Sequence, residues 1–183
     1  MVRNLMPAGW EDMDLLDIGV GDGYTIRLLK PSGRVSGVDF DPRAVLSAKE
    51  RGVDAREGSA YDLPFPSDSF GVVTCIEVLE HLENPQAALD QVSRLLRPGG
   101  YFIVTTPVPN LRWKVLWWLW TKFGPGKRWD KIPHITDLHV GGKSSNDGGL
   151  VAMLEERGLE VTKTSRCNYG MVAGLTARKR MKT

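Results

Sequence analysis

The chain has 183 residues, 42% of them hydrophobic, which is typical of a single soluble globular domain with a sizeable core. Its 24 basic and 22 acidic residues give a net charge of +2, a balance that argues against nucleic-acid binding. The sequence opens without the pattern of a secretory leader, and Cys75 and Cys167 match no metal or redox spacing, so a reducing cytoplasm is the expected location.

The first half of the sequence alternates short apolar strands with helices. A helix is expected to begin after Asp41, because aspartate is a preferred N-cap and Pro42 suits the first helical position. Residues 58–69 contain two prolines and no periodicity, which indicates a loop. In chain order, strands are predicted over 13–19, 34–40, 53–57 and 70–79, with helices over 22–30 and from 42 onward between the first three.

The second half begins with the clearest helix of the sequence. Asn84 and Pro85 form its N-terminal signal, and the Arg-Pro-Gly-Gly of 97–100 is expected to end it. Further on, the sequence predicts a strand over 101–106, a Trp-rich helix over 111–123 in an otherwise irregular region (107–149), a helix over 150–158 and strands near 159–164 and 170–177. This alternation predicts one α/β domain over 1–183, built on a doubly wound, mostly parallel sheet.

Three alternate glycines, Gly19, Gly21 and Gly23, directly follow the first predicted strand. Glycine there either makes a tight turn or lets a ligand approach the backbone, and the start of the next helix suits the polar end of a nucleotide-like ligand held by backbone N–H groups. Asp39 ends the second strand, where a carboxylate can accept hydrogen bonds from both ribose hydroxyls. The alternative role of Asp39 is to cap the following helix, for which Asp41 is better placed. Turn and acid together favour an adenosine site.

The acid in front of the glycines indicates which adenosine ligand is bound. Dinucleotide sites carry G-x-G-x-x-G, whereas this sequence has G-x-G-x-G preceded by Asp17. A carboxylate here repels a pyrophosphate and favours a positively charged ligand. S-adenosylmethionine, which carries an amino group and a sulfonium, meets this requirement. A short-chain NAD-dependent reductase is the weaker alternative, because no tyrosine is followed four residues later by lysine.

Successive motifs of the chain resemble those of the class I S-adenosylmethionine-dependent methyltransferases. They are LLDIGVGDG, GVDFDP, GSAYDLPFPSDSFGVV, CIEVLEHLENPQAAL and LLRPGGYFIVTTP. They are most similar to the methyltransferase-11 type, which includes ubiquinone and menaquinone biosynthesis enzymes. The resemblance runs from residue 14 to 108 and returns weakly at LVAMLEERGLEV. It implies S-adenosylmethionine as cofactor and a seven-stranded Rossmann-like sheet whose last strand is antiparallel.

The resemblance also implies a role for individual residues. His81 would lie at the mouth of the site, near the methyl acceptor. The other residues would surround the cofactor. Its methionine part would lie along Asp17, Gly19 and Gly21, with Gly23 completing the turn, and would be flanked by Ile76 and Glu77. The ribose would contact Asp39, and the adenine would contact Phe40, Ser59 and Ala60.

Three departures from the family pattern bear on the site. Ser59 stands where the family usually has aspartate, so a weaker hydrogen bond to the adenine amino group is expected. Gly71 replaces a common aspartate and is expected to affect the start of its strand. Only 14 residues with little helical pattern precede the first motif, which is expected to leave the cofactor more open or covered by another segment. A non-catalytic cofactor-binding or scaffold protein therefore remains the alternative function.

Methyl transfer from a sulfonium needs mainly alignment of the acceptor and exclusion of water. A general base helps only where the acceptor must lose a proton. The candidate bases are His81, His134 and His139, although each also suits a purely structural hydrogen bond. The two histidines of HITDLH, with one aspartate between them, are too few for a metal site, so no metal is predicted.

Five of the six tryptophans fall between Trp113 and Trp129. Trp113, Leu116, Trp117 and Trp120 recur at helical spacing and form one apolar face, in a run too short to span a bilayer. This face either packs on the core or serves as lid and acceptor wall. The second reading predicts a small apolar acceptor, such as a quinone precursor or lipid, and peripheral membrane contact through 111–123. The oligomeric state is left open.

Overall fold

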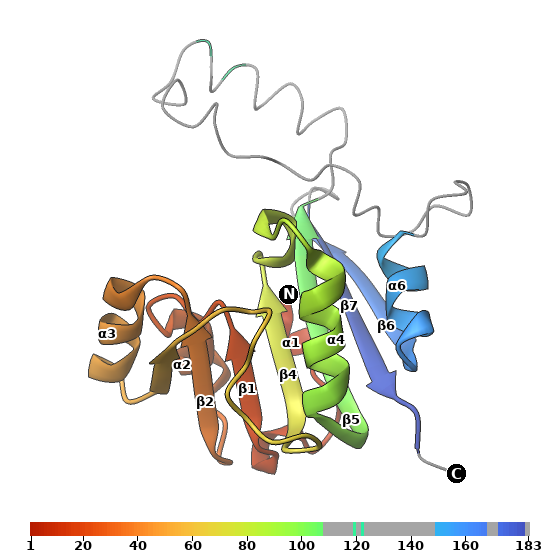
Figure 1. Cartoon of the computed structure of the whole chain (residues 1–183), viewed down its shortest axis with the longest axis horizontal. Helices are drawn as coiled ribbons and strands as arrows, with labels where there is room; N and C mark the ends of the chain where they lie inside the picture. Colours follow the sequence, from red (N-terminus) through yellow and green to blue (C-terminus); the bar gives the residue numbers. More distant parts are fainter. Residues whose placement is uncertain (108–118, 120–121, 123–148, 168–171, 182–183) are drawn as a thin grey trace.

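A seven-stranded sheet forms the centre of the computed structural model, which describes residues 1–107, 119, 122, 149–167 and 172–181 (Figure 1). The strands lie in the order β3-β2-β1-β4-β5-β7-β6. The pairs from β3 to β5 are parallel, and β7 runs antiparallel to both β5 and β6. The predicted doubly wound, mostly parallel sheet is therefore confirmed. The strands are β1 (Leu15–Ile18), β2 (Val35–Asp39), β3 (Asp54–Glu57), β4 (Phe70–Ile76), β5 (Leu96–Pro107), β6 (Leu159–Cys167) and β7 (Val172–Lys179).

Helices on both faces bury the sheet. The predicted N-caps are confirmed, because the Asp41 carboxylate accepts from the Arg43 N–H at 2.9 Å and the Asn84 side chain accepts from the Ala87 N–H at 3.1 Å. The helices are α1 (Val2–Leu5), α2 (Tyr24–Leu29), α3 (Pro42–Glu50), α4 (Pro85–Leu95) and α6 (Leu150–Glu156), with single 3₁₀ turns η1 (Trp10–Asp12) and η2 (Leu79–His81).

Alternate strand residues contribute to two separate apolar clusters. Leu16 and Val73 pack with α4 and α6, whereas Leu15 and Val72 pack with α1, α2 and α3. This is the pattern of parallel strands covered on both faces. Cys75 lies in the first cluster, and burial together with the negative charges of Asp17 and Glu80 raises the pKa of its thiol. Cys75 is therefore a buried free thiol that packs as a small apolar residue.

The start of β5 differs from the prediction. Arg-Pro-Gly-Gly was expected to separate α4 from a strand over 101–106, yet β5 begins at Leu96 directly after the helix. The register with β4 moves from Phe70↔Leu96 to Val72↔Tyr101, so residues 97–100 form an irregular stretch inside the strand pair. The prediction was wrong because Pro and Gly mark a break in regular pairing, and a bulge breaks the pairing without ending the strand.

The segment before β1 is more ordered than its sequence pattern indicates. Leu5 and Trp10 are buried, and the Thr176 hydroxyl donates to the Leu5 carbonyl at 2.6 Å. The N–H groups of Ser32 and Gly33 donate to the Glu11 carbonyl at 2.7 and 2.8 Å. Residues 1–12 therefore complete one face of the sheet with α2 and α3.

Several predicted features lie outside the described residues. These are most of the Trp-rich segment 111–123 and of the variable region 107–149, together with Trp113, Trp117, His134 and His139. In the described ranges, no helix has the length and apolar character needed to cross a membrane.

Candidate cofactor site

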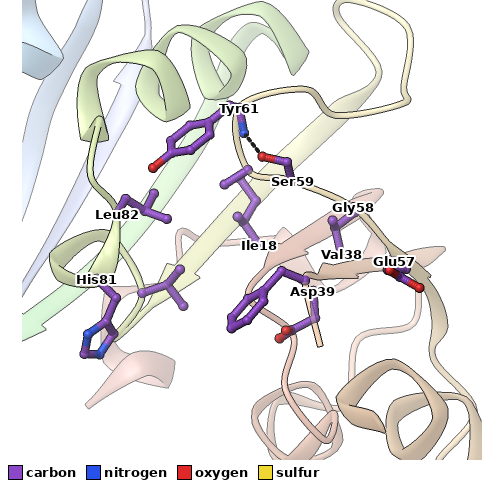
Figure 2. Close-up of a pocket in the computed structure, with 13 residues that line it drawn as sticks. Ile18, Val38, Asp39, Glu57, Gly58, Ser59, Tyr61, His81 and Leu82 are labelled. Carbon is purple, nitrogen blue, oxygen red and sulfur yellow. Dashed lines mark hydrogen bonds between the residues drawn. The ribbon is translucent and has the colours of Figure 1, made fainter. Parts of the chain in front are cut away.

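A cavity of about 670 Å³ opens at the carboxyl ends of β1, β2 and β3 (Figure 2). This is the edge at which open α/β sheets bind ligands. The loop after β3 and the 3₁₀ turn η2 supply the remaining walls. The lining consists of Ile18, Gly19, Val38, Asp39, Phe40, Glu57, Gly58, Ser59, Ala60, Tyr61, Val78, His81 and Leu82. The structure thus brings together six of the predicted site residues: Gly19, Asp39, Phe40, Ser59, Ala60 and His81.

The Asp39 carboxylate is fixed at the end of β2 by two backbone groups. Its Oδ2 accepts from the Gly21 N–H at 2.9 Å and its Oδ1 accepts from the Asp41 N–H at 3.0 Å. Each carboxylate oxygen has a second lone pair, so both retain the capacity to accept from a ligand in the cavity. Since Asp41 caps α3, Asp39 does not serve as its N-cap.

The backbone N–H groups of the glycine turn are hydrogen-bonded within the protein. The N–H groups of Gly19 and Val20 both donate to the Val38 carbonyl, at 2.8 and 3.1 Å. The Gly21 N–H donates to Asp39, and the Gly23 N–H donates to the Val20 carbonyl at 3.0 Å. These four N–H groups therefore have partners within the protein, and contact of the ligand with backbone N–H groups at the start of α2 stays a prediction.

Close contact between the turn and η2 explains the glycine at position 19. Gly19 has φ +72°, and a Cβ added there would overlap Val78 Cγ2. Gly21 has φ +54°, but no atom lies within 4 Å of an added Cβ. Gly21 is therefore needed for its backbone conformation alone, whereas Gly19 also lets Val78 of the opposite wall approach.

Asp17 lies beneath the turn and outside the cavity lining. It is 3% exposed, and its Oδ1 accepts from the Thr74 hydroxyl at 2.6 Å. Burial raises the pKa of Asp17 to about 7, and the negative charge of Asp39 adds to the increase. Sequence reasoning missed Thr74, whose only signal is its place opposite Asp17 in the β1–β4 register.

The end of β4 is bent sharply where it meets η2. Glu77 has φ +55°, which is uncommon for a residue with a side chain, and its N–H donates to the Thr105 carbonyl at 3.1 Å. Ile76 and Glu77, like Asp17, Gly21 and Gly23, lie outside the cavity lining. Their contact with the methionine part of the cofactor stays a prediction.

The turn η2 carries one exposed and one buried ionisable residue. His81 is exposed and lines the cavity (Figure 2). Glu80 is 3% exposed, and burial, with a smaller contribution from the charge of Glu77, raises its pKa to about 7. Glu80 Oε2 has no hydrogen-bond partner among the described residues. Sequence reasoning missed this burial, because a three-residue turn has too few positions to show an apolar face.

Among the residues the structure describes, no group of three or more His, Cys, Asp or Glu is arranged to hold a metal ion. The sheet order defines a Rossmann-like protein, and its cavity beside a strand-end acid lies at the edge where such folds bind nucleotide cofactors. A family model described as "Methyltransferase domain" matches residues 16–104. This match, together with the curated relatives, supports a class I S-adenosylmethionine-dependent methyltransferase, a family whose cofactor is S-adenosylmethionine.

Curated relatives agree with this assignment. The chain is 33% identical over 165 residues to a probable S-adenosylmethionine-dependent methyltransferase of Mycolicibacterium smegmatis, covering 88% of this chain and 57% of that protein. It is 29% identical over 177 residues to a ubiquinone biosynthesis O-methyltransferase of Colwellia psychrerythraea, covering 91% and 68%. The chain thus spans little more than half the length of the mycobacterial relative.

Solved structures share the fold at lower identity. A methyltransferase of Thermotoga maritima, described as a possible histamine N-methyltransferase, superposes with a TM-score of 0.71 at 21% identity, covering 98% of this chain and 86% of that one. The YcgJ protein of Bacillus subtilis gives a TM-score of 0.67 at 20% identity, covering 100% and 97%. Likeness at this level shows a common architecture.

Proposed function

We propose that the protein transfers the methyl group of S-adenosylmethionine to a small acceptor by in-line displacement. When bound, the cofactor supplies a methyl group on a positively charged sulfur, which is already activated as a leaving group. The observation that carries the proposal is the Asp39 carboxylate, held by two backbone N–H groups at the edge of the cavity. This chain's residues bind and orient the reactants and exclude water.

The adenosine half of the cofactor fits the side chains at the ends of β2 and β3. Asp39 accepts from the ribose hydroxyls, and Phe40, a cavity-lining residue that is 84% exposed, packs on the adenine. Ser59 and Ala60 form the adenine edge. The Ser59 hydroxyl oxygen accepts from the Tyr61 N–H at 3.2 Å, so its own O–H is available to donate to an adenine nitrogen.

The charges of the cavity favour a cation over a dinucleotide. Asp39 and Glu57 both line it, and the described lining contains no lysine or arginine. Asp17 lies below the glycine turn, close enough to Asp39 for the two charges to interact. The charges of Asp39 and Glu57, with that of Asp17 where it is ionised, attract an amino group or sulfonium and repel a pyrophosphate, which supports S-adenosylmethionine against NAD.

The first prediction tests the ribose contact. In calorimetry the parent protein should bind S-adenosylhomocysteine and show no response to NADH. Asp39→Ala should weaken the binding at least tenfold, because a hydrogen bond to a charged group contributes roughly 1.5–3 kcal/mol. Asp39→Asn, which keeps one acceptor oxygen, should lie between the two.

Asp41→Ala is the matched control for Asp39. It removes the α3 cap and lowers the melting temperature, yet it should leave binding within twofold because Asp41 is not in the cavity lining. Unchanged binding by Asp39→Ala would contradict the ribose assignment. Binding without transfer of labelled methyl to any component of a cell extract would identify the non-catalytic alternative.

For the acceptor we propose a small apolar molecule, lipid-like in character. Val78 and Leu82 make the η2 side of the cavity apolar, and His81 stands there as the candidate base. In sequence, the apolar face through Trp113 and Trp117 belongs to the variable region, where methyltransferases of this fold place specificity. The Colwellia relative is named a ubiquinone biosynthesis O-methyltransferase, which is consistent with such an acceptor.

The second prediction tests this acceptor through tryptophan fluorescence. Emission should shift when anionic vesicles or an apolar quinone analogue are added, because tryptophans of the 111–123 segment then move into an apolar environment. Trp117→Phe or Trp118→Phe should remove the shift. Trp10→Phe is the control, since Trp10 is buried in the core and should not report the addition. No emission change, together with protease resistance of the segment without ligand, would show that the segment is core.

A further inference from the structure

Two chain segments face each other across the cavity. The loop after β3 supplies one wall with Gly58, Ser59, Ala60 and Tyr61, and η2 supplies the other with His81 and its neighbours (Figure 2). The loop wall belongs to the irregular stretch 58–69, which has no helix and a single isolated β-bridge between Ser59 and Asp62. Its position therefore depends on bonds to other elements.

Helix α4 provides several of the bonds that hold this loop. Arg94 donates from Nη1 to the Phe65 carbonyl at 2.7 Å and from Nη2 to the Leu63 carbonyl at 2.9 Å. The same guanidinium donates to Gln91 Oε1 at 2.8 Å, and Gln91 Oε1 also accepts from the Leu63 N–H at 3.4 Å. Arg94 and Gln91 thus form a clamp, three residues apart on one helix face, that closes on the backbone of residues 63–65.

The same helix is joined to the opposite wall. Its N-terminus follows η2, and the N–H of its N-cap Asn84 donates to the Tyr61 hydroxyl at 3.2 Å. Tyr61 lines the cavity and projects toward Leu82 (Figure 2). Helix α4 therefore contacts the loop at two places and begins a few residues after η2, so it joins the two cavity walls.

We propose that Arg94 is a positioning residue for cofactor binding: it lies outside the cavity and acts through the loop that carries Ser59 and Ala60. The inference rests on the proposed cofactor site. A guanidinium suits the role because its fixed fork reaches two carbonyls and the Gln91 amide at once, whereas an ammonium group acts as a single point.

The loop also has apolar anchors, which set what loss of the clamp can do. Leu63 is buried in the core, and Phe65 packs edge-to-face on Phe70 with ring centroids 5.1 Å apart. Removal of Arg94 should therefore loosen the backbone of residues 58–63, while the Leu63 and Phe65 side chains keep the loop attached to the core. The expected result is weaker cofactor binding in a folded protein.

The experiment compares Arg94→Ala and Arg94→Lys with the parent, using calorimetry with S-adenosylhomocysteine and hydrogen exchange of the loop amides. Arg94→Ala should raise Kd at least fivefold and speed exchange at Tyr61, Asp62 and Leu63. Arg94→Lys should give an intermediate Kd. If Arg94→Ala fails to fold, Gln91→Met, which removes the partner of both Arg94 and the Leu63 N–H, replaces it.

Lys179→Met is the matched control. Lys179 Nζ donates to Asp68 at 2.8 Å and to the Ser93 and Leu96 carbonyls at 2.7 and 2.6 Å, so it joins the same loop and helix away from the cavity lining. The Lys179→Met variant should have a lower melting temperature than the parent and a Kd for S-adenosylhomocysteine within twofold of the parent's.

Equal weakening by Lys179→Met and Arg94→Ala would overturn the proposal, as would unchanged Kd and exchange in Arg94→Ala. No binding by the parent would instead contradict the proposed function, and loop exchange would still decide whether Arg94 holds the loop.

Discussion

Gly19→Ala should lower the free energy of unfolding by roughly 2–5 kcal/mol and remove measurable binding of S-adenosylhomocysteine. Two costs add at this position. A side chain at φ +72° costs about 1–2 kcal/mol, and the overlap of the new Cβ with Val78 forces a further adjustment of about 1–3 kcal/mol. Urea denaturation measures the loss of stability, and calorimetry measures the loss of binding.

The overlap affects binding because Val78 cannot easily move aside. A β-branched side chain has few χ1 alternatives, and Val78 directly precedes η2, so relief of the clash shifts the cavity wall that carries His81 and Leu82. Gly21→Ala separates the two costs, because its backbone is equally left-handed and nothing lies within 4 Å of the added Cβ.

The control variants give distinct outcomes. Gly21→Ala should lower the free energy of unfolding by only about 1–2 kcal/mol. Val78→Ala in the Gly19→Ala background should recover the part of the loss that comes from the overlap, which a double-mutant cycle measures as a coupling energy. Equal losses at positions 19 and 21 would show that the approach of Val78 contributes nothing.

Local sequence signals predicted most of the elements in this fold. The caps at Asp41 and Asn84 are formed within two or three residues of chain, so their geometry depends on little else. The apolar strands and the resemblance together indicated the sheet and the antiparallel β7. The start of β5 was missed because its pairing with β4 already begins at Leu96, before the glycines. Pairing depends on both strands, so the sequence of one strand alone does not show where it begins.

The sequence predicted which residues belong to the site better than it predicted which residues they contact. Asp39 and the glycines stand out in sequence because strand ends and turns have local signatures. The Thr74–Asp17 bond joins residues 57 positions apart, and the clamp of Arg94 on Leu63 joins residues 31 apart. Such partners follow from strand register and helix placement, which one sequence read locally does not specify.

Ionisation of Asp17 gives the second large effect. Because its pKa in the folded protein is about 7, against 3.8 in an ordinary environment, the native state binds more protons than the unfolded state between these values. Asp17 therefore makes the free energy of unfolding fall as pH rises from about 4 to 7, and the fall levels off above pH 7. The change in pKa from 3.8 to about 7 corresponds to roughly 4 kcal/mol.

Asp17→Asn should remove this part of the pH dependence. Thr74 can still donate to the amide oxygen, so near pH 4 the variant and the parent should have similar free energies of unfolding. At pH 8 the variant should be the more stable protein by up to several kcal/mol, since it buries no charge. Urea denaturation from pH 4 to 8 measures both curves.

Glu80 supplies the matched comparison, because burial raises its pKa to about 7 as well and it gives a fall over a similar range. Glu80→Gln should remove the part of the pH dependence that comes from Glu80 and leave the part that comes from Asp17. Of the parent, the two single variants and the double variant, the double variant should have the flattest curve of unfolding free energy against pH. Parallel curves for parent and Asp17→Asn would mean that Asp17 ionises normally beneath the turn. The buried carboxylate would then cost the fold little, and its negative charge would be present near neutral pH to attract the sulfonium of the cofactor.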